Sequence, residues 1–129
     1  YTSDHGENIF DDSRRLFLHA SPVPSYYELH VPFVVWTSEA YRRAWPQAAA
    51  CLEANRAKPV ATSASVFHTM LGLAGIATPL RNDSLSLSTA RYTPRPPVYL
   101  NDHNRAVPLG KMLRSEKDFE MFKKMGVEL

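Results

Sequence analysis

Near the start of the chain, Asp4, His5 and Glu7 bring together side chains that bind divalent metal ions. A carboxylate oxygen and an imidazole nitrogen on adjacent residues reach one ion where the backbone turns sharply, and Gly6 permits such a turn. His19 follows on the same stretch, as a ligand of a second ion or as a donor to a phosphate oxygen. Judged by residue types alone, the alternative that these residues form a solvated polar turn with a surface histidine is as well supported as a metal site.

The other residues with reactive or metal-binding side chains are expected to support the site or the fold rather than to bind metal or react. Glu7 is a candidate partner that orients His5, because metal-bound imidazoles usually donate their second N–H to a carboxylate or carbonyl. We expect His30 to be packed or hydrogen-bonded, His68 to lie in the core on a helix, and His103 to sit in a turn. No His-Asp pattern that would activate a nucleophile accompanies Ser63 or Ser65.

Two elements must position Asp4 and His5, namely the end of a strand just before them and the long loop that follows. Residues 1–3 resemble the last residues of a strand whose earlier part is missing, so we expect a fragment of a longer protein. Residues 4–30 contain few periodic apolar positions and several turn-forming residues, which predicts a loop. The apolar, β-branched and aromatic run 31–36 predicts a buried strand.

Helices are predicted over 38–44, 46–54 and 62–74. In the last of these, Thr62 or Ser63 is the expected N-cap, and Gly75 follows the end. Its expected core-facing residues are the apolar ones, namely Val66, Met70, Leu71 and Leu73.

The remaining sequence predicts a surface loop over 82–89, a short strand over 98–100, a turn over 101–104 and a last helix that begins near 115. In that helix Phe119 and Phe122 share one face.

Composition excludes several classes of protein. The 129 residues suit one folded domain, with 44% hydrophobic and 22% charged residues, so the chain is not disordered. Fifteen Lys+Arg against 13 Asp+Glu give a net charge of +2, which does not favour nucleic acid or an anionic membrane surface. No apolar stretch is long enough to span a bilayer. The single Cys51 forms no disulfide within the chain.

Four segments of the chain resemble the carboxyl-terminal part of bacterial phosphoethanolamine transferases. They are the motif Ser3-Asp4-His5-Gly6-Glu7, the pair Leu18-His19, and residues 28–38 and 67–76. These are membrane-anchored enzymes of the alkaline phosphatase and sulfatase superfamily. The resemblance covers most of the chain to about Leu100. The continuation Ile9-Phe10-Asp11-Asp12 is closer to the branch that modifies the lipopolysaccharide core than to the lipid A branch.

This resemblance implies that Asp4 and His5 are zinc ligands, and that His19 meets the phosphoryl group or a second zinc. The threonine nucleophile, a glutamate ligand and another histidine would lie upstream. The implied reaction moves phosphoethanolamine from a phospholipid donor to a glycolipid acceptor, either lipopolysaccharide core or lipid A. The implied location is the bacterial inner membrane, with the catalytic domain in the periplasm.

The implied fold is α/β, with residues 1–129 as the carboxyl-terminal portion of an alkaline-phosphatase-like sheet flanked by helices. The amino-terminal half of the catalytic domain and the membrane helices would be absent. Alternatives are a sulfatase, a phosphodiesterase, a lipoteichoic acid synthase, or a non-catalytic half-domain. We expect the isolated segment to be inactive, and to self-associate unless an upstream piece stays bound to it.

Overall fold

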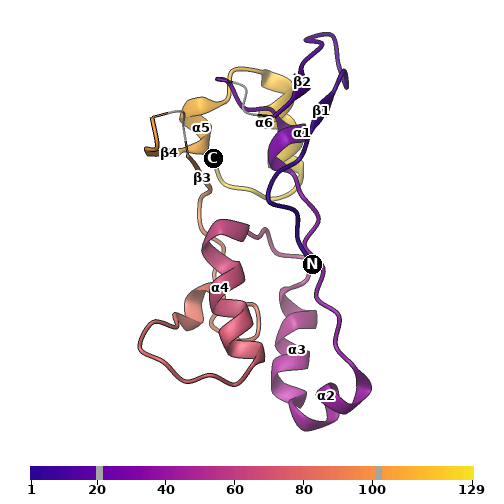
Figure 1. The fold of residues 1–129 in the computed structure, drawn as a ribbon, viewed down its shortest axis with the longest axis vertical. Coiled ribbons are helices and arrows are strands. Elements are labelled where there is room, and N and C mark those ends of the chain that lie inside the picture. Colours follow the sequence, from indigo (N-terminus) through magenta and orange to yellow (C-terminus); the bar gives the residue numbers. More distant parts are fainter. Residues whose placement is uncertain (20–21, 101–102) are drawn as a thin grey trace. The chain divides into compact units, whose positions relative to one another are not determined.

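A computed structural model describes residues 1–19, 22–100 and 103–129. The chain divides into two compact units, one formed by Tyr1–Val34 with Pro96–Leu129 and the other by Val35–Arg95. Figure 1 shows the elements of both units along the chain. Helices and two small antiparallel sheets give an α/β composition, as the sequence predicted.

In the first unit, the predicted loop over 4–30 contains regular structure. Strands β1 (Asn8–Ile9) and β2 (Phe17–Leu18) pair antiparallel, and α1 (Tyr26–Leu29) follows. The side chain of Ser25 caps α1 by accepting the backbone N–H of Glu28. The prediction of an unstructured loop was therefore wrong, because two-residue strands and a single helical turn are too short to leave a periodic apolar pattern.

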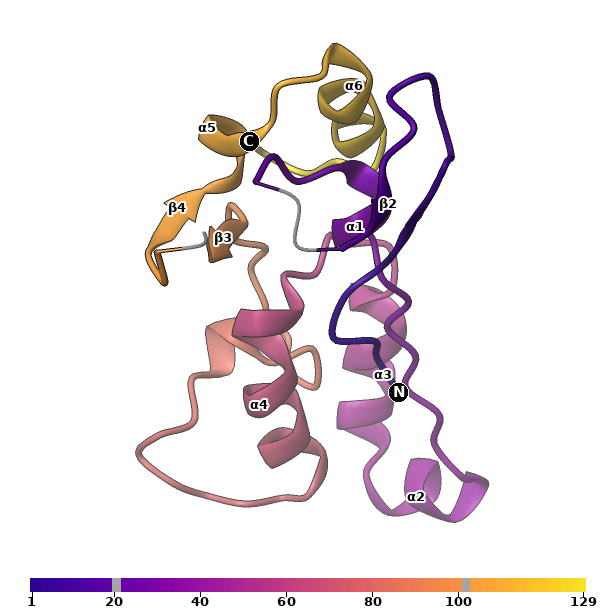
Figure 2. The ribbon, with the colours of Figure 1, turned by 45° about the horizontal axis from the view of Figure 1, so that its top comes forward.

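The carboxyl-terminal part of this unit supplies its core. Strands β3 (Val98–Leu100) and β4 (Ala106–Pro108) form a second antiparallel pair, which confirms the strand predicted over 98–100. Helices α5 (Leu109–Met112) and α6 (Glu116–Lys124) follow, and α6 lies beside α1 (Figure 2). The buried apolar cluster consists of Leu109, Leu113 and Phe122. Of the predicted turn over 101–104, residues 101 and 102 lie outside the described part of the chain.

The predicted buried strand over 31–36 does not form. Among the described residues, its strand pairing is limited to one isolated bridge between Phe33 and Thr2, flanked by two backbone hydrogen bonds between Val34 and Tyr1, and Trp36 is 82% exposed. A buried strand needs hydrogen-bonded neighbours on both sides and covered faces. The described residues provide a single bridge, so the segment is extended and largely exposed rather than central in a sheet covered by helices.

The second unit is helical. Helix α2 (Glu39–Ala44) is capped by the Ser38 hydroxyl, which accepts the backbone N–H of Tyr41, and α3 (Pro46–Asn55) begins with a proline in its first turn. Helix α4 (Thr62–Leu73) matches its predicted range, and Gly75 beyond it takes a positive φ of 66°. These helices confirm the sequence predictions.

The buried face of α4 differs from the predicted one. Ser65 and Thr69 are buried, whereas Met70 is 65% exposed. The Thr69 hydroxyl accepts the backbone N–H of Leu87, and a Cβ on Gly72 would lie 2.1 Å from the Ser88 hydroxyl oxygen. Segment 86–88 therefore packs on α4 through small polar side chains and hydrogen bonds, which an apolar periodicity cannot reveal.

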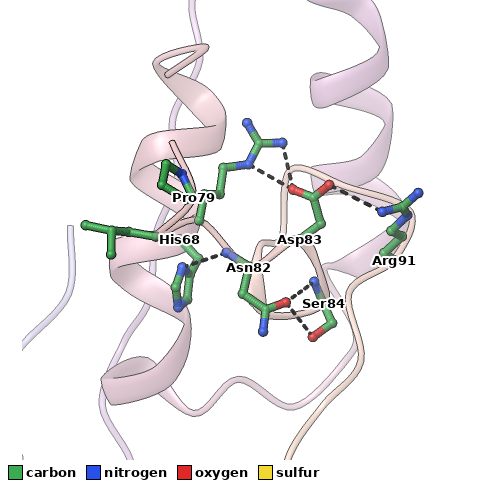
Figure 3. Close-up of a pocket in the computed structure, with 8 residues that line it drawn as sticks. His68, Pro79, Asn82, Asp83, Ser84 and Arg91 are labelled. Carbon is green, nitrogen blue, oxygen red and sulfur yellow. Dashed lines mark hydrogen bonds and ion pairs between the residues drawn. The ribbon is translucent and has the colours of Figure 1, made fainter. Parts of the chain in front are cut away.

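Two further expectations in this unit were wrong. The N-cap of α4 is Ala61, with no side-chain cap. Residues 82–89 are not a surface loop, because they contain the 3₁₀ helix η1 (Asp83–Leu85) and the buried residues 86–88. His68 is not in the core either: it is half-buried, and its Nδ1 accepts the backbone N–H of Asn82 at the wall of a pocket (Figure 3).

None of the helices in the described part of the chain combines the length and apolar character needed to cross a bilayer.

Candidate metal centre

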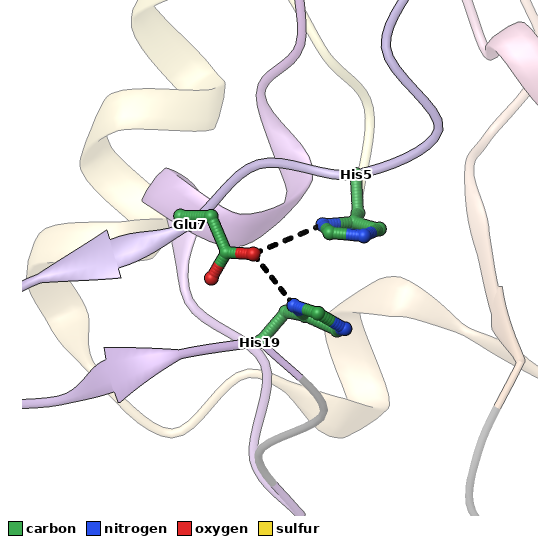
Figure 4. Close-up of side chains that lie close together, drawn as sticks. All are labelled: His5, Glu7 and His19. Atoms are coloured by element: carbon green, nitrogen blue, oxygen red, sulfur yellow. Dashed lines mark hydrogen bonds and ion pairs between the residues drawn. The ribbon is translucent and has the colours of Figure 1, made fainter.

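His5, Glu7 and His19 come together in the first unit (Figure 4). Each offers a ligand atom that lies within 4.8 Å of those of the other two. The Nδ1 atom of His19 donates a 2.7 Å hydrogen bond to Glu7 Oε1, and His5 Nδ1 lies 3.7 Å from the same oxygen. The two imidazole rings are 3.7 Å apart between centroids. Two imidazoles thus face one carboxylate.

The β1–β2 hairpin brings Glu7 and His19 together. Asn8 pairs with Leu18 in the antiparallel register, so the residue before Asn8 and the residue after Leu18 emerge at the same end of the hairpin. Asn8 is buried, and its amide donates a 2.8 Å hydrogen bond to the Leu18 carbonyl. Leu18 has a positive φ of 63°, so the chain changes direction immediately before His19.

The backbone around Gly6 positions His5. The Gly6 N–H donates a 2.6 Å hydrogen bond to the Glu28 carbonyl, and a Cβ on Gly6 would lie 2.1 Å from the Tyr27 carbonyl oxygen. Glycine is required here by the close approach of two backbones and not by a left-handed backbone conformation, since Gly6 is not among the glycines with positive φ.

Both imidazoles use Nδ1 for contacts with the protein. The Nδ1–H of His5 donates to the Gly6 carbonyl at 2.9 Å, and this hydrogen bond, together with the charges of Asp4 and Glu7, raises the pKa of His5. With Nδ1 engaged in each ring, Nε2 is left to bind a metal ion or a phosphoryl oxygen.

Asp4 lies outside the three-residue cluster. Its side chain is 88% exposed, but its Oδ2 is 3.8 Å from His5 Nε2. Two ligands of a tetrahedral zinc ion with bonds near 2.0–2.1 Å stand about 3.3 Å apart. A small side-chain rotation therefore lets Asp4 and His5 bind one ion, and the assignment of these two as ligands stays a prediction.

The donor set fits zinc. Two imidazole nitrogens and one or two carboxylate oxygens are the borderline and hard donors that zinc accepts. The side chains of His5, Glu7 and His19 are 38–45% exposed, so a ligand can reach them. The contact between Glu7 and His19 was missed from the sequence, because it depends on the hairpin register.

An ion-pair network holds the hairpin to α6. Arg14, in the β1–β2 connection, donates to both carboxylate oxygens of the fully buried Asp118 at 2.6 and 3.0 Å, and also to Asp12. The backbone N–H of Tyr26 donates to Asp118 as well. The Arg14 guanidinium holds the pKa of Asp12 at about 2, below its ordinary value of 3.8. The network ties the hairpin, α1 and α6 together.

His30 and His103 belong to the same unit but are not part of this cluster. His30 is exposed and its ring contacts Tyr26, with 4.8 Å between centroids. His103 is exposed.

Comparison with known proteins assigns the family. Residues 1–76 match the sulfatase family, which is more than half of the chain. The chain is 32% identical over 80 residues to the phosphoethanolamine transferase EptA of Salmonella typhimurium. It is 30% identical over 80 residues to the enzyme of that name from Escherichia coli K12 and from Escherichia coli O157:H7. Each alignment covers 60% of this chain and 14% of the relative.

The chain thus spans a small part of the length of these curated relatives. No solved structure matches it. The extent of the sulfatase match, together with a cluster of metal-binding side chains within the matched residues, shows that the chain belongs to the sulfatase family.

Proposed function

We propose that this chain forms part of a zinc-dependent enzyme that transfers phosphoethanolamine from a phospholipid to an envelope glycolipid, either lipopolysaccharide core or lipid A. The names of the three relatives support the reaction class. A metal-dependent mechanism is supported by the proximity of the ligand atoms of His5, Glu7 and His19, which all lie within 4.8 Å of one another. As the family resemblance implies, the whole enzyme would lie in the bacterial inner membrane, with this segment in the periplasm.

In this proposal Asp4 and His5 hold the zinc ion, which when bound supplies a Lewis acid that polarises a phosphoryl oxygen and activates a nucleophile. His19 faces the phosphoryl group through Nε2, and Glu7 fixes the orientation of the His19 ring by accepting its Nδ1–H. The nucleophile would be a threonine on another segment, and the acceptor hydroxyl would resolve the covalent phospho-enzyme.

Zinc content tests the metal assignment. Elemental analysis of the full-length protein should show bound zinc, and the Asp4→Ala and His5→Ala variants should each contain much less. His30→Ala is the matched control, because His30 is exposed and lies outside the cluster. Equal zinc in the wild type and in both ligand variants would contradict the assignment.

Turnover tests the reaction. The full-length protein, supplied with a phosphatidylethanolamine donor and a lipopolysaccharide acceptor, should transfer the headgroup to the acceptor, and the 129-residue chain alone should not. Cleavage of a sulfate ester or a phosphodiester without transfer would instead support another activity of the sulfatase family.

A further inference from the structure

The second unit contains a polar pocket with a volume of about 660 Å³. Its walls come from His68 on α4, from residues 79–84 and from Arg91 (Figure 3). These residues are separate from His5, Glu7 and His19, so whatever binds in the pocket uses other side chains than the proposed zinc centre.

Two side chains of the pocket present N–H donors. Because His68 Nδ1 accepts the backbone N–H of Asn82 at 3.1 Å, the proton of the neutral ring is on Nε2. The Oδ1 atom of Asn82 accepts both the N–H and the hydroxyl of Ser84, which orients its Nδ2 as a donor. Within the described part of the chain, neither His68 Nε2 nor Asn82 Nδ2 has a hydrogen-bond partner.

The charged groups of the pocket leave an excess of positive charge. Arg81 donates through Nε to Asp83 Oδ1 at 2.8 Å, whereas Arg91 approaches the other oxygen of Asp83 only to 3.8 Å. One carboxylate therefore faces two guanidinium groups. The Arg91 side chain is 80% exposed and loosely paired, so it can turn toward a bound anion without loss of a strong ion pair.

We propose that this pocket binds a phosphate group, either free phosphate or the phosphate of a monoester headgroup. The oxygens of a phosphate accept hydrogen bonds, and they complement the Nε2–H of His68, the amide of Asn82 and the guanidinium of Arg91. Arginine is suited to this role because its planar fork of donors matches two phosphate oxygens.

The proposal is tested by NMR titration with inorganic phosphate and, separately, with O-phosphoethanolamine, using the chain with Phe10→Ser and Phe17→Ser, two exposed residues outside the pocket whose replacement limits self-association. Backbone amide shifts that saturate and that centre on residues 82–84 are expected. Arg91→Ala should weaken binding about fivefold, the effect of one exposed charge pair. Asn82→Asp keeps the oxygen that accepts from Ser84 and replaces the amide donor with a repelling oxygen, so it should abolish binding.

Arg56→Ala is the matched control, because Arg56 is an exposed arginine of the same unit that does not line the pocket. Unchanged amide shifts elsewhere in the spectrum confirm that each variant is folded. Shifts that do not saturate, or an equal loss of binding in Arg56→Ala and Arg91→Ala, would overturn the proposal.

Vesicles identify the source of the phosphate. Binding to phosphatidic acid in phosphatidylcholine, but not to phosphatidylcholine alone, and weaker binding by Arg91→Ala, would assign a lipid headgroup. Saturation by the soluble anions alone would assign a soluble phosphate. The pocket shares no side chain with the proposed zinc centre. Phosphate binding can therefore be absent while zinc is found, and zinc can be absent while phosphate binds.

Discussion

Glu7 accepts a 2.7 Å hydrogen bond from His19 and lies 3.7 Å from His5, so a single carboxylate sets the environment of both imidazoles. The charge of Glu7 contributes to the raised pKa of His5, and its hydrogen bond orients the His19 ring, whose Nε2 would face the phosphoryl group. Glu7 therefore links the two histidines of the proposed centre.

Glu7→Gln should raise the zinc dissociation constant about tenfold or more, because the amide keeps the shape of the side chain but loses its charge. Competition with a chromophoric chelator measures the affinity. Glu120→Gln, an exposed change on α6, is the control and should leave the affinity unchanged. Equal affinities for Glu7→Gln and the wild type would show that Glu7 takes no part in metal binding.

Asp12 makes the stability of the chain depend on pH. Its pKa in the folded protein is about 2, mainly because Arg14 donates hydrogen bonds to it, whereas its ordinary value is 3.8. A lowered folded-state pKa contributes stability that is complete above pH 4 and is lost as the pH falls through 2.

We therefore expect the free energy of unfolding to decrease more steeply between pH 4 and pH 2 in the wild type than in Asp12→Asn. Urea unfolding followed by circular dichroism at several pH values measures this difference. Parallel pH dependences for the two proteins would contradict the role assigned to the Asp12–Arg14 pair.

Among the elements, the β1–β2 hairpin and α1 position the candidate site together. The hairpin register aligns Glu7 with His19, and the backbone hydrogen bond from Gly6 to Glu28 holds the preceding residues against α1. Arg14 then ties the hairpin connection to Asp118 on α6. A site on such short strands depends on these tertiary contacts, because two-residue strands are not stable alone.

Gly6→Ala should displace this segment, since its Cβ would lie 2.1 Å from the backbone oxygen of Tyr27, which cannot move aside like a flexible side chain. We expect lower stability and weaker zinc binding together, measured by thermal unfolding and zinc titration. Gly110→Ala is the comparison, because its nearest neighbour, in the last residue of the chain, would be 3.1 Å away. An effect of Gly6→Ala no larger than that of Gly110→Ala would show that the segment has room for a side chain.

Over the whole molecule, the described part of the chain buries few apolar side chains for its length. Buried hydrophobic residues are limited to five in the described part, namely Leu87, Tyr92, Leu109, Leu113 and Phe122. Large apolar side chains are exposed on the hairpin, where Phe10 stacks on Phe17 with 5.0 Å between ring centroids, and at Trp36. Exposed apolar surface of this kind promotes association.

We therefore expect the 129-residue chain to self-associate at micromolar concentration when no other part of the protein covers these side chains. Size-exclusion chromatography with light scattering should give a mass above 14.6 kDa. The double variant Phe10→Ser with Phe17→Ser should shift the mass toward that of the monomer. A cooperatively unfolding wild-type monomer would show that the segment completes its own core.

Local sequence determined the elements whose formation depends on near neighbours. The capping hydroxyl of Ser38, the proline that begins α3 and the glycine beyond α4 act within one helical turn, and α2, α3 and α4 appear at the predicted positions. The sequence also predicted metal binding for Asp4 and His5, a phosphoryl or second-zinc contact for His19 and an orienting role for Glu7, because residue type and spacing are properties of the chain itself.

Only the tertiary structure decided which of these side chains meet. Glu7 faces His19 because Asn8 pairs with Leu18, and Gly6 is glycine because α1 approaches its backbone, and neither contact leaves a local pattern. The composition of residues 31–36 is typical of a buried strand. Burial also requires neighbouring strands and covering helices, and within the described residues this segment forms one isolated β-bridge. Local preferences fix elements, whereas pairing and close approach depend on residues far apart in the chain.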